Sequence, residues 1–174
     1  TGWNTAADGS GTPYTAGGSY KLTAEDDILY AQWTANEGTV YTVEHYKVNA
    51  DGTSATLANS ENLTGTTDTT ATATPKTYSG YTYQPEYDQN GMKTVASGKI
   101  AGDGSLVLKL YYTPNDDKLT YDGNRATGGS TGATTGKVDQ EVTVAENGFT
   151  KAGYTFTGWN TAADGSGTPY TAGG

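Results

Sequence analysis

The feature that most constrains this chain is an exact internal repeat. Residues 1–18, TGWNTAADGSGTPYTAGG, recur letter for letter as residues 157–174, an offset of 156 residues. Identity over eighteen positions is too strict for two separately evolved domains, so it indicates one period of a tandem array together with a duplicated overlap. We therefore expect the two ends of the chain to be fragments of one module type.

The composition favours small β modules with thin cores. Only 33% of the residues are hydrophobic, whereas ordinary globular chains have about 45–50% when glycine is counted. The chain nevertheless has 14 tyrosines and many threonines, which suit the half-buried surface of a sheet. Its 25 glycines gather in turn-like dipeptides such as Asp51-Gly52 and Asp103-Gly104.

Alternating and β-branched patterns predict several strands and almost no helix. Any helix should be limited to short turns near 147–151 or 87–92. In the strongest pattern, SLVLKLYYT, leucines alternate with other residues, as in a core strand. The predicted strands are Thr39–Val48, Ser105–Thr113, Ile28–Thr34, Gln140–Ala145 and Tyr154–Asn160.

Two breaks in composition predict module borders. One is Ala35-Asn36-Glu37-Gly38, and the other is Pro114-Asn115-Asp116-Asp117, where proline ends a strand and charge marks an exposed joint. A complete module should lie between them, at 36–115. Residues 1–35 should be the C-terminal part of a second module type, and 118–174 its N-terminal part, with a 156-residue period.

The flanking motifs resemble a known family. GYTFTGW at Gly153–Trp159, a polar Asp/Gly loop after it, and LYAQW at Leu29–Trp33 are similar to the Listeria–Bacteroides repeat, the internalin-type B repeat of bacterial surface proteins. The opening KLTYDGN, from Lys118, resembles the first strand and turn of that family.

The middle segment resembles a different family. VEHY at Val43–Tyr46 and LVLKLYY at Leu106–Tyr112 are similar to the mucin-binding-protein (MucBP) type of repeat. Both resemblances imply mainly β or α+β chains of small β-grasp (ubiquitin-like) modules in tandem, strung along proteins attached to the cell wall. Neither family implies catalytic residues or a cofactor.

The residues themselves also argue against catalysis and nucleic-acid binding. His45 is the sole histidine, there is no cysteine, and no Ser/His/Asp spacing or nucleophile elbow appears, so we expect no enzyme. A net charge of −9 gives no basic stripe for phosphates. No apolar run approaches the length of about 20 residues that a membrane helix requires, so we expect no membrane insertion.

Calcium is the strongest metal hypothesis. Asp8 and Asp164, at equivalent positions of the repeated loop, offer hard oxygen ligands, but the loops lack EF-hand spacing and their Asp-Gly pairs are already explained by turns. We therefore expect no metal site and no cofactor, and keep these two residues as weak candidates.

Aromatic side chains give two further hypotheses. Tyr81, Tyr83 and Tyr87 could form an exposed stripe that contacts a carbohydrate or a protein. Other large residues at the two ends should form the core that completes the split module. They are Trp3, Ile28, Tyr30, Trp33, Tyr154, Phe156 and Trp159.

The sequence thus predicts a non-catalytic stalk or spacer of a large extracellular bacterial adhesin or surface filament, located at the cell surface or cell wall. Its partners should be neighbouring copies of the same repeat, with 118–174 of one copy completed head to tail by 19–35 of the next. The sequence leaves open whether these ends pair between chains or belong to one continuous chain. The alternative is a module that binds host glycans or mucin.

Overall fold

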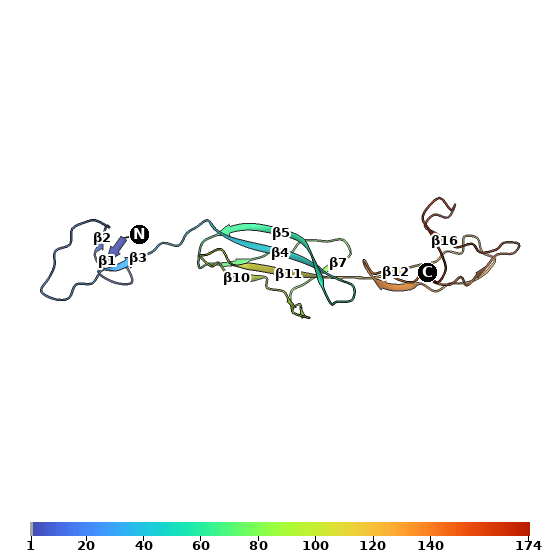
Figure 1. The fold of residues 1–174 in the computed structure, drawn as a ribbon, viewed down its shortest axis with the longest axis horizontal. Helices are drawn as coiled ribbons and strands as arrows, with labels where there is room; N and C mark the ends of the chain where they lie inside the picture. The colour runs from blue at the N-terminus through green and yellow to red at the C-terminus, as the bar shows by residue number, and fades with distance from the viewer. Residues whose placement is uncertain (1) are drawn as a thin grey trace. The chain divides into compact units, whose positions relative to one another are not determined.

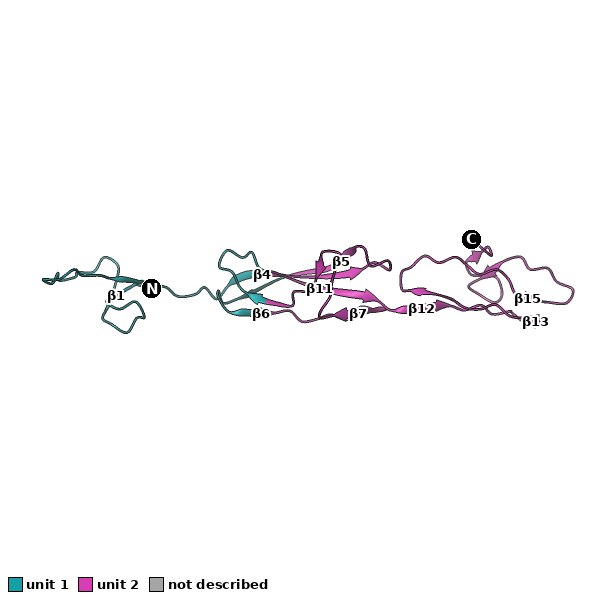
Figure 2. Cartoon of the chain, turned by 90° about the horizontal axis from the view of Figure 1, so that it is seen from below, with its two compact units in different colours: residues 1–41, 62–71, 98–106 teal, residues 42–61, 72–97, 107–174 magenta. Residues whose placement is uncertain are grey.

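The computed structural model describes residues 2–174. Thr1, the first residue of the predicted N-terminal part and of the repeated block, lies outside the described residues. The chain divides into two compact units (Figure 2). The first comprises residues up to Tyr41, Asn62–Ala71 and Gly98–Leu106, and the second comprises Thr42–Glu61, Thr72–Ser97 and Val107–Gly174. This division cuts through the predicted middle module, so the predicted borders stay a prediction.

The described residues form strands and turns without a helix (Figure 1), which confirms the mainly β class. The strands are β1 (Gly2–Asn4), β2 (Pro13–Tyr14), β3 (Tyr30–Gln32), β4 (Thr39–Val48), β5 (Ala55–Gly65), β6 (Thr70–Thr72), β7 (Tyr81–Gln84), β8 (Asp88–Gln89), β9 (Met92–Lys93), β10 (Ser97–Lys99), β11 (Val107–Pro114), β12 (Asp116–Leu119), β13 (Gly128–Gly129), β14 (Thr134–Lys137), β15 (Phe149–Thr150), β16 (Trp159–Asn160) and β17 (Pro169–Tyr170).

The strands build several small sheets. The largest has four strands in the order β5-β4-β11-β7, and a three-stranded sheet at the N-terminal end has the order β2-β1-β3. The two-stranded sheets are β10-β6, β12-β14, β13-β15, β16-β17 and β8-β9. Helical turns were expected near 147–151 and 87–92, but these segments contain β15 in one case and β8 and β9 in the other.

The core lies on the largest sheet, where β11 runs parallel to β4 and antiparallel to β7. Leu108 is opposite Val43 and Leu110 is opposite His45, so these four side chains share one face. Each is at most 1% exposed. Burying one such leucine stabilises a fold by about 1.5–3 kcal/mol, so this face contributes strongly to the stability of the middle segment.

The opposite face of the same sheet is covered by aromatic rings. Tyr111 stacks on Tyr46 with ring centroids 5.2 Å apart and on Tyr87 at 5.5 Å. Val48 and Tyr87 are buried beside Tyr111, and Met92 from β9 packs against them. Tyr46 also donates to the carboxylate of Glu44 at 2.7 Å, a bond that raises its pKa to about 12.

Residues 116–174 have little buried surface. β12 pairs with β14 from Asp116 opposite Lys137 to Leu119 opposite Thr134, and Gly128 in β13 faces Thr150 in β15. Val144, at 7% exposed, is the one buried hydrophobic side chain in this segment. The predicted strand Gln140–Ala145 does not form, and of Tyr154–Asn160 only β16 is a strand.

Candidate functional site

The repeated block folds into the same hairpin at both ends of the chain. In the N-terminal copy Trp3 is opposite Tyr14 and Asn4 is opposite Pro13. In the C-terminal copy Trp159 is opposite Tyr170 and Asn160 is opposite Pro169. Because identical residues take an identical register in two different surroundings, the hairpin is encoded by local sequence.

An asparagine holds the loop of each hairpin. Asn4 Nδ2 donates to the carbonyls of Gly9 and Gly11 at 3.0 and 3.3 Å, while Asn4 Oδ1 accepts from the amide of Ala6 at 2.8 Å. Asn160 makes the same three bonds to the equivalent residues of its copy. These side-chain hydrogen bonds therefore fix the conformation of the long loop.

Asp8 and Asp164, the two calcium candidates, form hydrogen bonds within this loop. The Asp8 carboxylate accepts from the hydroxyl and amide of Ser10 at 2.6 and 3.0 Å, and Asp164 does the same with Ser166. These bonds lower the pKa of both carboxyls. Within residues 2–174, no three His, Asp or Glu side chains gather closely enough to hold a metal ion.

In the N-terminal copy the hairpin gains a third strand. β3 pairs with β1, with Gln32 opposite Gly2, Ala31 opposite Trp3 and Tyr30 opposite Asn4. The segment that leads into β3 also packs on the hairpin, because the ring of Tyr20 lies 5.0 Å from that of Tyr14.

Large apolar side chains of this N-terminal copy remain exposed. Trp3 is 42% exposed, although its strand, β1, is paired along both edges. The other predicted core residues of this end are 40% exposed at Tyr30, 60% at Ile28 and 88% at Trp33.

In the C-terminal copy the equivalent tryptophan, Trp159, is half-buried, with three aromatic rings beside it. The ring of Trp159 lies 4.7 Å from Tyr121, 5.1 Å from Phe156 and 6.1 Å from Phe149. Its Nε1 donates to the carbonyl of Ala145 at 2.9 Å. Tyr121 and Phe149 were missing from the predicted core, although Tyr121 belongs to the KLTYDGN motif that could have signalled it.

The C-terminal copy lacks the third strand, however. Among the described residues only β17 pairs with β16. Gly158, the equivalent of Gly2, has φ +139° instead of lying in a strand. Tyr170, the equivalent of Tyr14, is 49% exposed.

The two copies are therefore complementary. One has the third strand and an uncovered tryptophan, and the other has the aromatic cover and an unpaired strand edge. Of the predicted core residues, Phe156 and Trp159 are in contact and Tyr30 pairs beside Trp3. Tyr154 is 73% exposed, with Lys151 Nζ 4.7 Å from its ring centre.

The expected exposed tyrosine stripe is not formed. Tyr87 is only 8% exposed, since it stacks on Tyr111. Tyr83 is half-buried, with its ring 5.5 Å from that of Tyr112. Tyr81 is half-buried too, and its hydroxyl donates to Asp139 at 2.8 Å. The three residues lie on or near one short strand, but their rings serve packing in different places.

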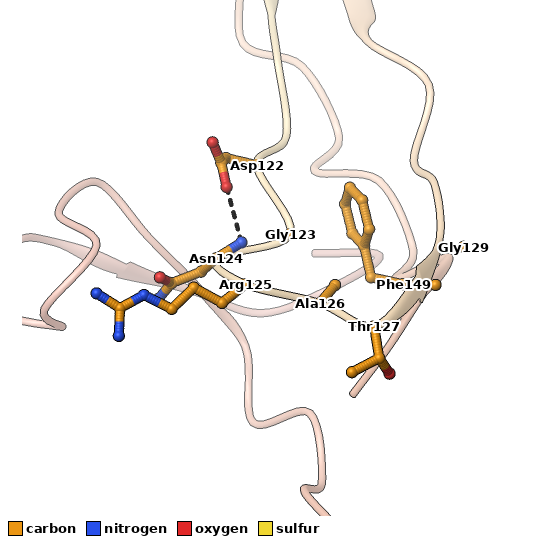
Figure 3. A pocket seen from close by; sticks show the side chains of 9 residues that line it. Asp122, Gly123, Asn124, Arg125, Ala126, Thr127, Gly129 and Phe149 are labelled. Carbon is orange, nitrogen blue, oxygen red and sulfur yellow. Dashed lines mark hydrogen bonds between the residues drawn. The ribbon is translucent and has the colours of Figure 1, made fainter. Parts of the chain in front are cut away.

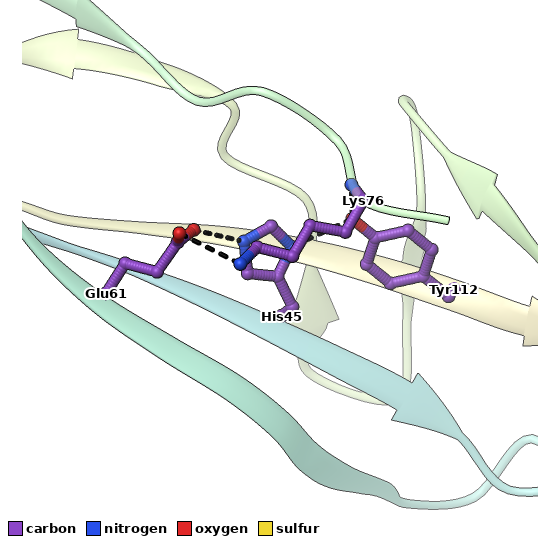
Figure 4. Close-up of polar contacts among 4 residues, drawn as sticks. All are labelled: His45, Glu61, Lys76 and Tyr112. Carbon is purple, nitrogen blue, oxygen red and sulfur yellow. Dashed lines mark hydrogen bonds and ion pairs between the residues drawn. The ribbon is translucent and has the colours of Figure 1, made fainter. Parts of the chain in front are cut away.

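A polar network surrounds the buried side chain of His45 (Figure 4). Its Nδ1 lies 2.8 Å from the hydroxyl of Tyr112 and its Nε2 lies 3.1 Å from the carboxylate of Glu61. The amide of Lys76 donates to the same hydroxyl at 2.9 Å, and Lys76 Nζ lies 2.9 Å from Glu61.

Hydrogen-bond counting assigns the protons of this network. The Tyr112 hydroxyl accepts from Lys76 and has one proton to donate, which His45 Nδ1 can accept, so Nε2 carries the ring proton and donates to Glu61. Bonds from Lys76 and then from His45 lower the pKa of Glu61. His45 and Tyr112 are both 0% exposed, so these two rings serve the packing of the sheet, whereas the side chains of Glu61 and Lys76 are 34% and 36% exposed.

An open hollow of about 320 Å³ lies in the loop of residues 122–129 (Figure 3). Phe149 also lines it, and Asp122 accepts from the amide of Asn124 at 2.7 Å. Asn124 and Arg125 have φ of +44° and +65°, unusual for residues with side chains. The hollow holds no pair of carboxylates or nucleophile with a base, so its shape follows from the turn.

No helix among residues 2–174 has the length and apolar character needed to cross a bilayer. The chain is 34% identical over 154 residues to a protein of Evansella cellulosilytica named "Putative membrane protein". This alignment covers 86% of the chain but 22% of that relative, so the chain spans about a fifth of the relative's length. No solved structure matches the chain.

Residues 118–174 match the Listeria-Bacteroides repeat domain. The matched segment includes the C-terminal hairpin with all of its aromatic cover. The expected mucin-binding-protein-type module at 36–115 and the second repeat part at 1–35 stay predictions. A Listeria-Bacteroides repeat domain is therefore found at residues 118–174, about a third of the chain.

Proposed function

We propose that this chain is part of a non-catalytic, tandemly repeated stalk in an extracellular bacterial adhesin or surface filament. The observation that carries the proposal is the pair of identical hairpins, 156 residues apart, in complementary surroundings. A spacer needs regular length and compatible neighbours rather than a reactive cleft, and the repeat supplies both.

Completion of split modules follows from the same proposal. Residues 118–174 of one repeat would be completed by 19–35 of the next, head to tail, and the β-grasp description would apply to such a completed module. The exposed Trp3 and the unpaired edge of β16 support this reading, since each lacks what the other copy has.

Contacts across the second predicted border support a stalk with limited bending. The amide of Asn115 donates to the carbonyl of Gly80 at 2.8 Å, and the amide of Val138 donates to the carbonyl of Asn115 at 3.0 Å. Net charge of −9 in each such chain would also keep repeats apart in solution.

Arrays of one, two and three 156-residue periods test the stalk. Small-angle X-ray scattering should show the largest dimension rising by the same increment with each period added. Arrays whose largest dimension stays nearly constant would contradict a spacer.

The alternative, a module that binds glycans or mucin, is tested on the same material. Trp33 and Tyr154 are 88% and 73% exposed, and such rings could stack on sugars. Saturable binding of the 174-residue chain to a glycan array, lost in the Trp33→Ala or Tyr154→Ala variant, would favour the binding module. A spacer should give no specific signal.

A further inference from the structure

The chain contains two Asn-Gly pairs, Asn90-Gly91 and Asn147-Gly148. In such a pair the amide nitrogen of the glycine can attack the side-chain carbonyl carbon of the asparagine, because glycine has no side chain to obstruct the approach. The attack needs an amide that can lose its proton to solvent and an asparagine side chain that can turn toward it. The structure gives the two pairs opposite surroundings.

Asn90-Gly91 is the open pair. It connects β8 to β9, where Gln89 lies opposite Met92, so the two residues form the tip of a tight hairpin. Asn90 has φ +51° and Gly91 has φ +76°, as the two central residues of a type I′ turn require. Both residues are exposed, and nothing lies within 4 Å of a Cβ built on Gly91.

The reacting groups of this pair have few restraints. Among residues 2–174 the Gly91 amide donates to no acceptor, so solvent can remove its proton. The Asn90 side chain is held by a hydrogen bond from Nδ2 to the carbonyl of Gly52 at 2.8 Å. This bond is exposed, and water can replace either partner at little net cost, so the side chain is released readily.

Asn147-Gly148 is the closed pair. The Gly148 amide donates to the Thr131 hydroxyl at 2.9 Å, and the Gly148 carbonyl accepts from the amide of Ser130 at 3.1 Å. The Asn147 side chain accepts from the amide of Phe149 at 2.9 Å and donates to its carbonyl at 3.0 Å. A Cβ built on Gly148 would collide with the Ser130 carbonyl oxygen. The proton of the attacking nitrogen and the orientation of the side chain are therefore both fixed.

We propose that Asn90 is a site of spontaneous deamidation in the folded protein and that Asn147 is protected from it. The Gly91 nitrogen forms a bond to Cγ of Asn90, and the bond from Cγ to Nδ2 breaks. The Gly91 amide proton passes through water to the departing nitrogen, which leaves as ammonia. Water then opens the cyclic imide at either carbonyl, which gives aspartate or isoaspartate at position 90. This chemistry is independent of the proposed function.

The reaction changes the surroundings of the turn. Neither product has the side-chain amide that donates to Gly52, and each carries a new carboxylate. Isoaspartate also routes the main chain through the former side chain, which lengthens a turn whose two residues set the register of β8 on β9. Met92, which follows the turn, packs against the cluster around Val48 and Tyr111. Deamidation should therefore loosen β8 and β9 and this side of the cluster first.

The first test follows the wild-type 174-residue chain in mildly alkaline buffer, once folded and once unfolded in urea. Trypsin separates the two sites, because the peptides 77–93 and 138–151 each contain one asparagine. Mass spectrometry measures the replacement of amide by carboxyl in each peptide. In the folded chain 77–93 should react about tenfold faster than 138–151 or more, because Asn147 reacts only after local opening. In urea the two peptides should react at similar rates.

Equal rates in the folded chain, a faster reaction at Asn147, or no reaction at either site would overturn the inference. Asn90→Gln assigns the reaction to this residue. Attack on the longer side chain forms a larger, less favoured ring, so peptide 77–93 of this variant should keep its mass. A mass increase at the wild-type rate would place the reaction elsewhere in the peptide and would equally overturn the inference.

The loosened turn has its own measurement. Amide hydrogen exchange within 88–93 should be faster in the reacted chain than in the Asn90→Asp variant, which has the new charge without the lengthened turn. Equal exchange in the two would contradict the effect assigned to isoaspartate.

Thr131→Val tests the protection of the closed pair. The variant removes the acceptor of the Gly148 amide proton. It should raise the rate at Asn147 several-fold in the folded chain and leave the rate at Asn90 unchanged. Thr131→Ser, a matched control that keeps the hydroxyl, should react like the wild type. An unchanged rate at Asn147 in Thr131→Val would contradict the protection assigned to this bond.

Discussion

Gly80 lies directly against the side chain of Val138. A Cβ atom on Gly80 would be 2.8 Å from Cγ1 of Val138 and 3.0 Å from Cγ2, and Gly80 has φ +77°. The two residues stand on either side of the predicted border at 114–117, which proline and charge marked as an exposed joint. The tertiary structure instead holds this joint by close packing and by the backbone bonds through Asn115.

Gly80→Ala should therefore loosen the joint. Gly91 provides the matched control, because its φ is +76° but nothing lies within 4 Å of a Cβ built on it. Both variants suffer the same backbone strain, so we expect Gly80→Ala to cost about 1–3 kcal/mol more in unfolding free energy, the range found for overpacking. Denaturant unfolding of both variants measures the difference, and equal losses would show that the contact with Val138 is unimportant.

Tyr112→Phe should destabilise the middle segment by about 1–3 kcal/mol, because it leaves His45 Nδ1 and the amide of Lys76 without the hydroxyl that serves both. Tyr78→Phe is the control. Its ring lies 4.9 Å from that of Tyr112, but its buried hydroxyl has no hydrogen-bond partner among residues 2–174. Tyr78→Phe should be neutral or stabilising in thermal unfolding, and similar losses in the two variants would contradict the assigned network.

The network around Glu61 should make the protein acid-sensitive. Lys76 and His45 hold the pKa of Glu61 below its ordinary value in the folded state. A carboxyl with a lowered folded pKa contributes stability above its unfolded pKa of about 4.3, and loses it as the pH falls through the folded pKa. Urea unfolding at a series of pH values should show this loss in the wild type.

Glu61→Gln should be less stable than the wild type at pH 7 and should approach it in acid, because glutamine does not titrate. A difference that stays constant with pH would show that the ion pair contributes nothing. Lys76→Met gives the second arm of a double-mutant cycle with Glu61→Gln.

Chelation should leave the repeated loops unchanged. Asp8 and Asp164 already accept two bonds each from a serine, and Asn4 and Asn160 close the loops without a metal. We expect the same melting temperature in EDTA and in millimolar calcium. A rise in melting temperature with calcium would restore the metal hypothesis for these residues.

Local patterns in the sequence were sufficient for the strands with strong side-chain alternation. The predicted strand Thr39–Val48 coincides with β4, and Ser105–Thr113 overlaps β11 with Leu108 and Leu110 in the core as expected. β5, the longest strand, was missed, because ATLANSENLTG has no apolar alternation and most of it faces solvent. Gln140–Ala145 has the residue types of a strand, but its backbone pairing is limited to Val144, which exchanges hydrogen bonds with Gly173 and Gly174.

The interaction candidates were harder to place. Tyr81, Tyr83 and Tyr87 were expected on one surface, yet Tyr87 is buried against a strand more than twenty residues later. A tyrosine suits a core and a surface equally well, so its exposure depends on which distant ring reaches it. The same holds for Tyr121 and Phe149 around Trp159.

The sequence by itself determined the repeated hairpin, down to its register and the asparagine that closes its loop, because all of those contacts lie within eighteen residues. Only the tertiary structure decided what lies beside each copy: β3 along Trp3, and Tyr121, Phe149 and Phe156 around Trp159. The physical reason is that hydrogen bonds within a turn depend on neighbouring residues, whereas the burial of a ring depends on segments that only the folded chain brings together.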